Sequence, residues 1–212
     1  MYAVISKEKT QLAPGTVVRM PGTWQDYHSL RESRSDRSIP RIKYRQGEIL
    51  LMSPMPRHGR EANILADIVK ALLDSQNRNY EAFTPITMEL PEEQGIEPDY
   101  CFYITHWQAV VGKERINWQV DPPPDLVIEI DVTSYTAVED YLAYRVPEVW
   151  LFRNKSLKIY QLQQDNYQLC SFSLYFPTID LLEIVDRVFQ QAAEQGTGVA
   201  LRELRQNLEF RI

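Results

Sequence analysis

The segment that most constrains the fold is 125–132, which follows three consecutive prolines and reads Asp-Leu-Val-Ile-Glu-Ile-Asp-Val. Successive side chains of a β-strand point to opposite faces. One face of this segment would be wholly aliphatic, with Leu126, Ile128, Ile130 and Val132. The other would carry three carboxylates around a valine, with Asp125, Val127, Glu129 and Asp131. So apolar a strand is typical of the centre of a sheet, and we predict that position for it.

Three carboxylates on a central strand need compensation, because burying an ionised carboxylate alone costs several kcal/mol. A basic partner, a solvent-filled cleft or a cation could provide it, and a divalent metal does so most directly. Another acid, Asp99, begins an expected strand thirty residues before Glu129. Mg²⁺ prefers oxygen ligands and usually keeps several waters. Asp99 and Glu129 could therefore form an incomplete metal cage, open to phosphate and a nucleophilic water.

The segment 57–75 follows Pro54 and Pro56 and has apolar residues at helical spacing, which predicts an amphipathic helix. Extending its apolar stripe towards the N-terminus brings His58 and Glu61 onto the buried face. Burying these two groups is costly unless they have partners. Alternatively, His58 is a satisfied histidine at a helix end, and Glu61 is a first-turn acid favoured by the helix dipole.

The rest of the chain predicts further helices and strands. Helices are expected over 24–32 with Thr23 as N-cap, over 134–144, from Thr178 to 191, and after Gly198. Strands are expected over 41–45 and 48–52 as a hairpin, within 80–90 with a break at Pro85, and over 99–105, 149–152, 157–160 and 167–174.

The composition is that of a globular protein. The 212 residues are 44% hydrophobic and 25% charged, and no linker-like stretch divides them. We predict an N-terminal extension over 1–22, a main domain over 23–192 and a C-terminal helical extension over 193–212 that packs on the domain. Two cysteines, no signal-peptide pattern and no apolar run of membrane-spanning length favour a soluble, cytoplasmic protein without a membrane partner.

The net charge of −6 argues against a protein that coats nucleic acid generally, but the charge is uneven. Residues 1–60 hold 11 Lys and Arg against 5 Asp and Glu, which would suit a basic docking face. Arg41, Lys43 and Arg45 share one face of an expected strand and could contact phosphates, although a solvated strand face would explain them as well. Trp107 and Trp118 could stack on bases, or serve packing or a subunit contact.

The order of these acids carries a family resemblance. A helix with Glu61, a strand with Pro98-Asp99 and a strand with Glu129-x-Asp131 together resemble the PD-(D/E)xK nucleases. More specifically, the chain resembles the bacterial putative restriction endonuclease family over about residues 20–190. The motifs of this closer resemblance are Met52-Ser53-Pro54 with His58, Gly95-Ile96-Glu97-Pro98-Asp99, Asp125-Leu126-Val127-Ile128-Glu129 and Val146-Pro147-Glu148-Val149-Trp150.

The resemblance implies an α/β (α+β) fold with a restriction-endonuclease-like core, in which helices flank a mixed β-sheet. It also implies that Asp99 and Glu129 bind Mg²⁺ or Mn²⁺ for the hydrolysis of DNA phosphodiester bonds. Glu61 would complete or support this site, and His58 would bind substrate or orient an acid. Asp131 is a further candidate acid, which could also be a helix cap or a loop residue.

The sequence departs from the superfamily pattern at its lysine, because the position two residues after Glu129 holds Asp131. In related families the lysine can lie on the following helix, but segment 134–144 contains none. Arg145 is the nearest cation in the sequence. It could hold a phosphate but, with a pKa above ~12, could not readily act as a base.

These observations leave three hypotheses. The leading one is a metal-dependent endonuclease with DNA as its substrate. The second is a DNA-binding protein with a nuclease fold and no turnover, which the missing lysine motivates. The third is a homodimeric or larger interaction protein whose tryptophan-bearing loop and terminal helices make the subunit contacts.

Overall fold

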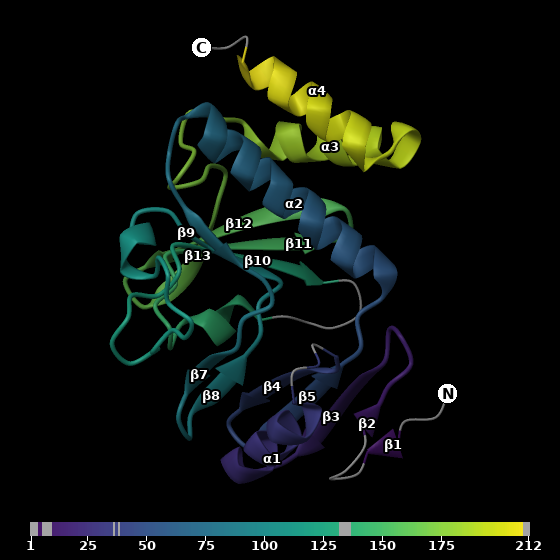
Figure 1. Ribbon diagram of the computed structural model, residues 1–212, viewed down its shortest axis with the longest axis vertical. Coiled ribbons are helices and arrows are strands. Elements are labelled where there is room, and N and C mark those ends of the chain that lie inside the picture. The colour runs from purple at the N-terminus through teal and green to yellow at the C-terminus, as the bar shows by residue number, and fades with distance from the viewer. Residues whose placement is uncertain (1–3, 6–9, 36, 38, 132–136, 210–212) are drawn as a thin grey trace.

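The computed structural model describes residues 4–5, 10–35, 37, 39–131 and 137–209. Within them lie two large sheets, four α-helices and a short pair of strands near the N-terminus, β1 (Val4–Ile5) and β2 (Thr10–Gln11) (Figure 1). One large sheet has six strands and the other has five. Helices flank the six-stranded mixed sheet, which confirms the predicted α/β (α+β) class.

The six-stranded sheet has the order β13-β12-β11-β10-β9-β6. Strand β10 (Leu126–Asp131) lies inside it, as predicted, between β9 (Tyr100–Tyr103) and β11 (Glu148–Arg153). It runs parallel to β11 and antiparallel to β9, so the sheet is mixed. The remaining strands are β6 (Glu81–Phe83), β12 (Ser156–Gln163) and β13 (Asn166–Cys170).

The two faces of β10 belong to different apolar clusters, as the alternation of its side chains predicts. Leu126, Ile128 and Ile130 are buried in the cluster that includes residues of α2 (Pro56–Ser75), α3 (Leu181–Gln195) and α4 (Thr197–Glu209). Figure 1 shows α2 running across this sheet, with α3 and α4 lying against each other beside it. Val127 is buried on the opposite face, which Glu129 and Asp131 share by parity.

The five-stranded sheet is antiparallel, and its order is β3-β5-β4-β8-β7. Its strands are β3 (Val17–Pro21), β4 (Arg41–Arg45), β5 (Glu48–Met52), β7 (Met88–Leu90) and β8 (Gln94–Ile96). The predicted hairpin over 41–45 and 48–52 is therefore confirmed. Strand β3 falls within the segment 1–22 and pairs with β5 along its whole length, so it is part of this sheet.

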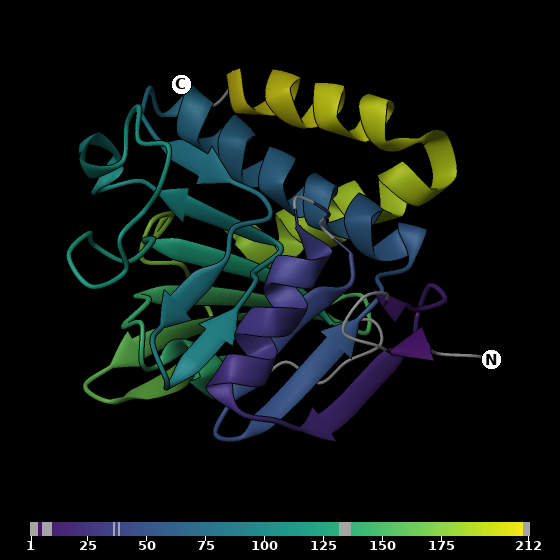
Figure 2. The same cartoon turned by 60° about the horizontal axis from the view of Figure 1, so that its bottom comes forward.

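Helix α1 (Trp24–Arg34) covers the five-stranded sheet (Figure 2). It begins at the predicted N-cap, because Thr23 and Asp26 form a capping box in which each side chain accepts from the other residue's backbone N–H. Its fully buried residue is Tyr27. Gly95 of β8 lies so close to the Tyr27 ring that a Cβ atom there would collide with it.

The two sheets are joined at Pro98-Asp99. Strand β8 ends at Ile96 in the five-stranded sheet, and β9 begins at Tyr100 in the six-stranded sheet. Residues 97–99 therefore cross from one sheet to the other. This connection places Asp99 where the two sheets meet.

Three predicted elements differ in the structure. Residues 138–141 of the expected helix 134–144 form a 3₁₀ helix, η2 (Val138–Tyr141), and residues 134–136 lie outside the described part. The strand expected to reach residue 174 ends at Cys170, because the hydroxyl of Ser173 and the N–H of Leu174 donate to Glu148 instead of continuing a ladder. Helix α3 begins after Asp180 rather than Thr178, since the Asp180 carboxylate accepts from the Glu183 N–H at 3.0 Å.

The two cysteines lie in different surroundings. Cys101 is fully buried in β9, and burial raises the pKa of its thiol to about 12. Cys170 is partly exposed at the end of β13, and both thiols are free. Separately, none of the helices within the described ranges has the length and apolar character needed to span a membrane.

Candidate functional site

Asp99 is held against the central strand of the six-stranded sheet. Its side chain is fully buried, and Oδ2 accepts a 2.7 Å hydrogen bond from the N–H of Ile130 on β10. The guanidinium of Arg41, on β4 of the other sheet, forms an ion pair with Oδ1. The backbone carbonyl of Asp99 accepts from Thr84 Oγ1 at 2.6 Å. These contacts fix the carboxylate beside the residue that follows Glu129.

Glu129 lies close enough to Asp99 for the two charges to repel each other. Burial raises the pKa of the Glu129 carboxyl to about 8, and the negative charge of Asp99 adds to this rise. The Tyr141 hydroxyl donates a short hydrogen bond to Glu129 Oε1, which lowers the pKa of this carboxyl. The positive charges of Arg41 and Lys43 lower it as well. The structure therefore brings Asp99 and Glu129 together.

A cavity of about 40 Å³ lies beside Glu129, between the two sheets. The volume suits a few water molecules or an ion rather than a nucleotide. Its polar lining consists of Arg41, Lys43, Glu97, Glu129, Asp140 and Tyr141. Strands β4 and β10 and the 3₁₀ helix η2 thus surround a small polar space with both acids and bases on its walls.

The bases come from one face of β4, where Arg41, Lys43 and Arg45 alternate with the buried residues Ile42 and Tyr44. Their side chains are 16%, 25% and 38% exposed. Lys43 and Arg45 both form ion pairs with Asp140 of η2, and the Arg45 pair is 2.5 Å long. A freely solvated strand face does not describe Arg41 and Lys43, because Arg41 pairs with Asp99 on the connection between the sheets and Lys43 pairs with Asp140 on η2.

His58 and Glu61 are both buried on the inner face of α2, as the stripe of that helix predicts. His58 Nε2 lies 3.3 Å from Asp99 Oδ2. Burial lowers the pKa of His58, and the attraction of Asp99 opposes this shift. Glu61 pairs with Arg57 one turn earlier at 2.7 Å, and its charge also acts on His58. His58 thus stands behind Asp99, whereas Glu61 lines a separate pocket with residues of α3 such as Asp186, and no contact joins it to Asp99 or Glu129 among the described residues.

Asp131 and Arg145 lie apart from the carboxylate pair. Asp131 is in register with Arg153 of β11 and forms an ion pair with it. Arg145 is exposed and pairs with Asp165 at 2.7 Å. It precedes β11, whose first residue pairs with Leu126 at the opposite end of β10 from Glu129. The structure therefore does not bring Arg145 to Asp99 and Glu129.

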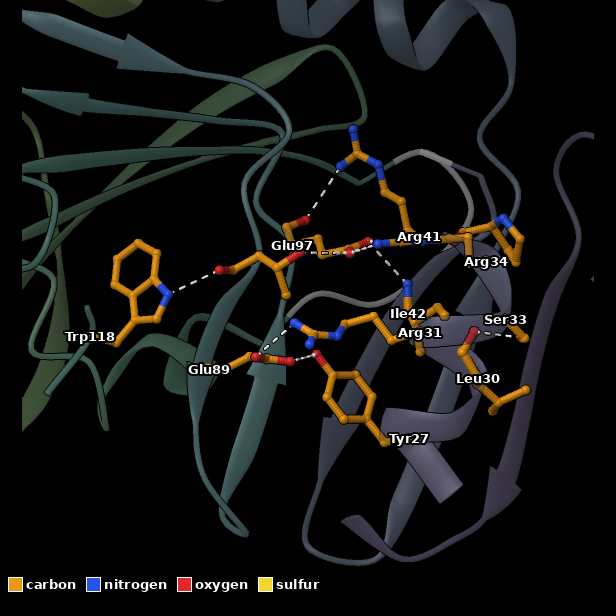
Figure 3. A network of polar contacts seen from close by, with 12 residues as sticks. Tyr27, Leu30, Arg31, Ser33, Arg34, Arg41, Ile42, Glu89, Glu97 and Trp118 are labelled. Atoms are coloured by element: carbon orange, nitrogen blue, oxygen red, sulfur yellow. Dashed lines mark hydrogen bonds and ion pairs between the residues drawn. The ribbon is translucent and has the colours of Figure 1, made fainter. Parts of the chain in front are cut away.

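Glu97, two residues before Asp99, lines the same cavity and is the centre of a network that includes Arg41 (Figure 3). Arg34 of α1 donates two hydrogen bonds to the Glu97 carboxylate, of 2.7 and 2.5 Å. The N–H of Ile42 and the hydroxyl of Thr87 also donate to this carboxylate. Nearby, the Trp118 indole N–H donates to the Thr87 carbonyl, and the partly buried ring packs against an apolar cluster of the protein. Glu97 thus ties α1 and β4 to the connection that carries Asp99.

The residues around Asp99 suit a hard divalent cation, although they are few. Among the described residues, no group of three or more His, Cys, Asp or Glu side chains could hold a metal ion. Mg²⁺ needs only one or two carboxylates when waters and substrate phosphate supply its other ligands. Burial and the charge of Asp99 disfavour the ionised form of Glu129 and raise its pKa. A bound cation would stabilise that ionised form. The donor set therefore fits the implied metal.

The residues that sequence reasoning left out of the site are Arg41, Lys43, Asp140 and Tyr141. Strand parity did place Arg41 and Lys43 on one face, but no sequence pattern showed that this face meets β10. Asp140 and Tyr141 were expected on a helix rather than at a cavity. Their contribution depends on how the two sheets pack together.

Comparison with known proteins adds two findings. The sequence matches the model of the Uma2 family, described as putative restriction endonuclease, over residues 24–194. The structure is similar to the crystal structure of a putative nuclease belonging to DUF820 from Anabaena variabilis ATCC 29413. That likeness has a TM-score of 0.51 at 17% sequence identity, covers 77% of this chain and 92% of that chain, and concerns the fold. No curated protein matches.

Proposed function

Because the chain belongs to the Uma2 family of putative restriction endonucleases, we propose that it is a metal-dependent endonuclease that hydrolyses DNA phosphodiester bonds. The observation that carries this proposal is the position of Asp99 and Glu129 at the junction of the two sheets, beside a polar cavity, where burial and then the charge of Asp99 raise the pKa of Glu129. Perturbed carboxyl groups beside a polar cavity are typical of catalytic sites. We assign these two residues as ligands of Mg²⁺ or Mn²⁺.

Each side chain around the pair has a separate task in this proposal. Asp99 is oriented by the Ile130 N–H and backed by His58, and Glu129 is oriented by Tyr141. Arg41 and Lys43 offset the negative charge of the phosphate that approaches the acids. When bound, the metal ion would polarise the phosphate and lower the pKa of a water.

The reaction itself exchanges one bond to phosphorus for another. A water oxygen bonds to phosphorus, and the bond from phosphorus to one deoxyribose oxygen breaks. The water gives up a proton, and the departing oxygen takes one. The protein residues hold the phosphate and the two carboxylates in place while this exchange occurs.

The test is cleavage of plasmid and linear DNA in Mg²⁺ or Mn²⁺ by the wild type, Asp99→Ala and Glu129→Ala. We expect both substitutions to reduce cleavage by about a hundredfold or more, as removal of a charge-stabilising group does. Asp165→Ala removes an exposed carboxylate and should cleave like the wild type. Circular dichroism would show that all variants fold. Cleavage that survives both site substitutions would overturn the proposal.

A second candidate is DNA binding without turnover, which the acid at position 131 favours. Asp131 stands where the nuclease pattern has lysine, and Arg153 neutralises it. This candidate predicts salt-dependent retention of DNA in a gel-shift assay and no cleavage in any divalent metal. Any metal-dependent cleavage that Asp99→Ala abolishes would exclude it.

A further inference from the structure

The nuclease pattern needs a positive group at the carboxylates, and its usual position two residues after Glu129 is filled by Asp131. The cations nearest in sequence do not fill this role. Arg145 is exposed at the other end of β10, and Arg153 is paired with Asp131. The cations whose charges act on Glu129 are Arg41 and Lys43, both from β4. The positive charge at this site therefore comes from the opposite sheet.

Of these two cations, Arg41 is already bound by other groups of the protein. Its guanidinium pairs with the fully buried Asp99 and also reaches the carbonyl of Glu97 at 3.4 Å. If Arg41 turned away towards a substrate, the Asp99 carboxylate would lose its charge partner, which is costly in a buried place. Arg41 is thus better suited to neutralise Asp99 than to donate hydrogen bonds to a substrate phosphate.

Lys43 is held more loosely. Its side chain is 25% exposed and lines the same cavity as Glu129 and Tyr141. An ammonium has three N–H donors, and within the described part of the chain Asp140 is the one acceptor bonded to it. Asp140 also has Arg45 as a partner at 2.5 Å. If the ammonium turned its remaining donors to a phosphate, Asp140 would remain neutralised.

We propose that Lys43 is the ammonium that contacts the scissile phosphate, supplied by β4 of the five-stranded sheet in place of a lysine on β10. This inference rests on the proposed nuclease function. Lys43 donates hydrogen bonds to a non-bridging oxygen of the phosphate and stabilises the charge that develops there during attack by water. Asp140 positions it by holding the ammonium at the edge of the cavity.

The decisive experiment compares Lys43→Ala with Arg19→Ala under single-turnover conditions in Mn²⁺. Both cations lie on the five-stranded sheet, but Arg19 pairs with Glu48 and its side chain is 52% exposed, whereas Lys43 lines the cavity with Glu129. We expect Lys43→Ala to lower the cleavage rate constant by about 10²- to 10³-fold, as loss of one oxyanion donor does. Arg19→Ala should change it by less than about threefold, because an exposed pair contributes little, and Lys43→Arg should restore part of the lost rate.

Two further measurements separate this role from a structural one. Mn²⁺ binding, followed by titration calorimetry, should be similar in Lys43→Ala and the wild type, because Asp99 and Glu129 remain. In Ca²⁺, DNA affinity should fall in Lys43→Ala, and the slope of log affinity against log salt should shrink by about one. Should Lys43→Ala fail to fold, Lys43→Met keeps the aliphatic stem and takes its place.

The outcomes distinguish this inference from the proposed function. If the wild type cleaves and Lys43→Ala behaves like Arg19→Ala, Lys43 has no special role and this inference alone fails. If the wild type binds DNA without cleaving it, the DNA affinity measured in Ca²⁺ tests the role of Lys43. Equal DNA affinities for Lys43→Ala and the wild type would overturn the inference. If the wild type neither cleaves nor binds DNA, the proposed function and this inference both fail.

Discussion

At the scale of single residues, Arg41 gives the clearest energetic prediction. It is the charge partner of Asp99, a carboxylate with no exposed surface. Substitution by Gln leaves that carboxylate unpaired, which typically costs about 3 kcal/mol of unfolding free energy. We expect Arg41→Gln to lower stability in urea by this amount, and Arg19→Gln, which breaks an exposed pair on the same sheet, to have almost no effect.

Metal addition should partly reverse this loss. At the proposed metal site, a cation bound by Asp99 and Glu129 would replace the missing positive charge and stabilise the folded state in proportion to ln(1 + [L]/Kd). Mg²⁺ or Mn²⁺ should therefore raise the Tm of Arg41→Gln by more than that of the wild type in a thermal-shift titration. Equal increases in both proteins would mean that Arg41 and the metal do not share the same charge environment.

Glu148 provides a prediction for pH. It is fully buried at the start of β11 and accepts from Trp150, Ser173 and Leu174, yet burial raises the pKa of its carboxyl. A folded-state pKa above the unfolded value, about 4.3, means that the folded protein holds its proton longer. Stability from this group is therefore complete at low pH and is lost as the pH rises through the folded pKa.

The measurement is denaturant unfolding between pH 4 and pH 8 for the wild type and Glu148→Gln. The neutral amide cannot ionise, so the wild type should lose stability relative to Glu148→Gln as the pH rises. Because Gln has one acceptor oxygen for several donors, the variant should be less stable at the acidic end by about 1–3 kcal/mol. A stability difference that does not vary with pH would show that Glu148 does not titrate in this window.

At this scale the sequence predicted what alternation and helical periodicity can show. It placed Ile128 and Ile130 on one face of β10 and Glu129 on the other, and it placed His58 on the inner face of α2. It could not show which cation meets which acid, because Arg41 on β4 and Asp99 on the connection between the sheets are far apart in sequence. Packing between distant segments decides such pairs, and no local pattern records it.

At the scale of elements, the connection between the sheets depends on Glu97. Its carboxylate joins α1 to β4, and the side chains of Arg34 and Glu97 are only 10% and 4% exposed. We expect Arg34→Ala and Glu97→Ala each to cost about 3 kcal/mol of unfolding free energy. The double variant should cost much less than the sum. A double-mutant cycle measures this coupling, and additive costs would show that the two residues act independently.

The elements that the sequence predicted well have strong local signals. Thr23 with Asp26 and the hairpin around Gln46-Gly47 are such cases, since caps and turns are set by residues close in sequence. The expected helix 134–144 had a weaker basis, and its residues 138–141 form a 3₁₀ helix instead. There Asp140 binds Lys43 and Arg45, and the Tyr141 hydroxyl binds Glu129, so tertiary contacts rather than helical propensity set the local backbone.

At the scale of the whole molecule, the C-terminal helix belongs to the main core. Ala200, Leu201 and Leu204 of α4 are buried in the same cluster as residues of α2 and β10. We expect Leu204→Ala to cost about 2–5 kcal/mol, as removal of a buried leucine does. A single unfolding transition, seen both by far-UV circular dichroism and by tryptophan fluorescence, would support one cooperative unit. Separate transitions would mean that the segment 193–212 folds by itself.

The buried thiol of Cys101 makes the opening of this molecule chemically measurable. Cys101 lies opposite Val127 and Phe83 inside the sheet, two residues after Asp99, and its pKa of about 12 keeps it protonated and inert at neutral pH. An alkylating reagent should modify the partly exposed Cys170 at once and Cys101 only when the strands separate. The slow labelling rate then reports how often the sheet opens beside the carboxylates. An ion bound there should slow that labelling.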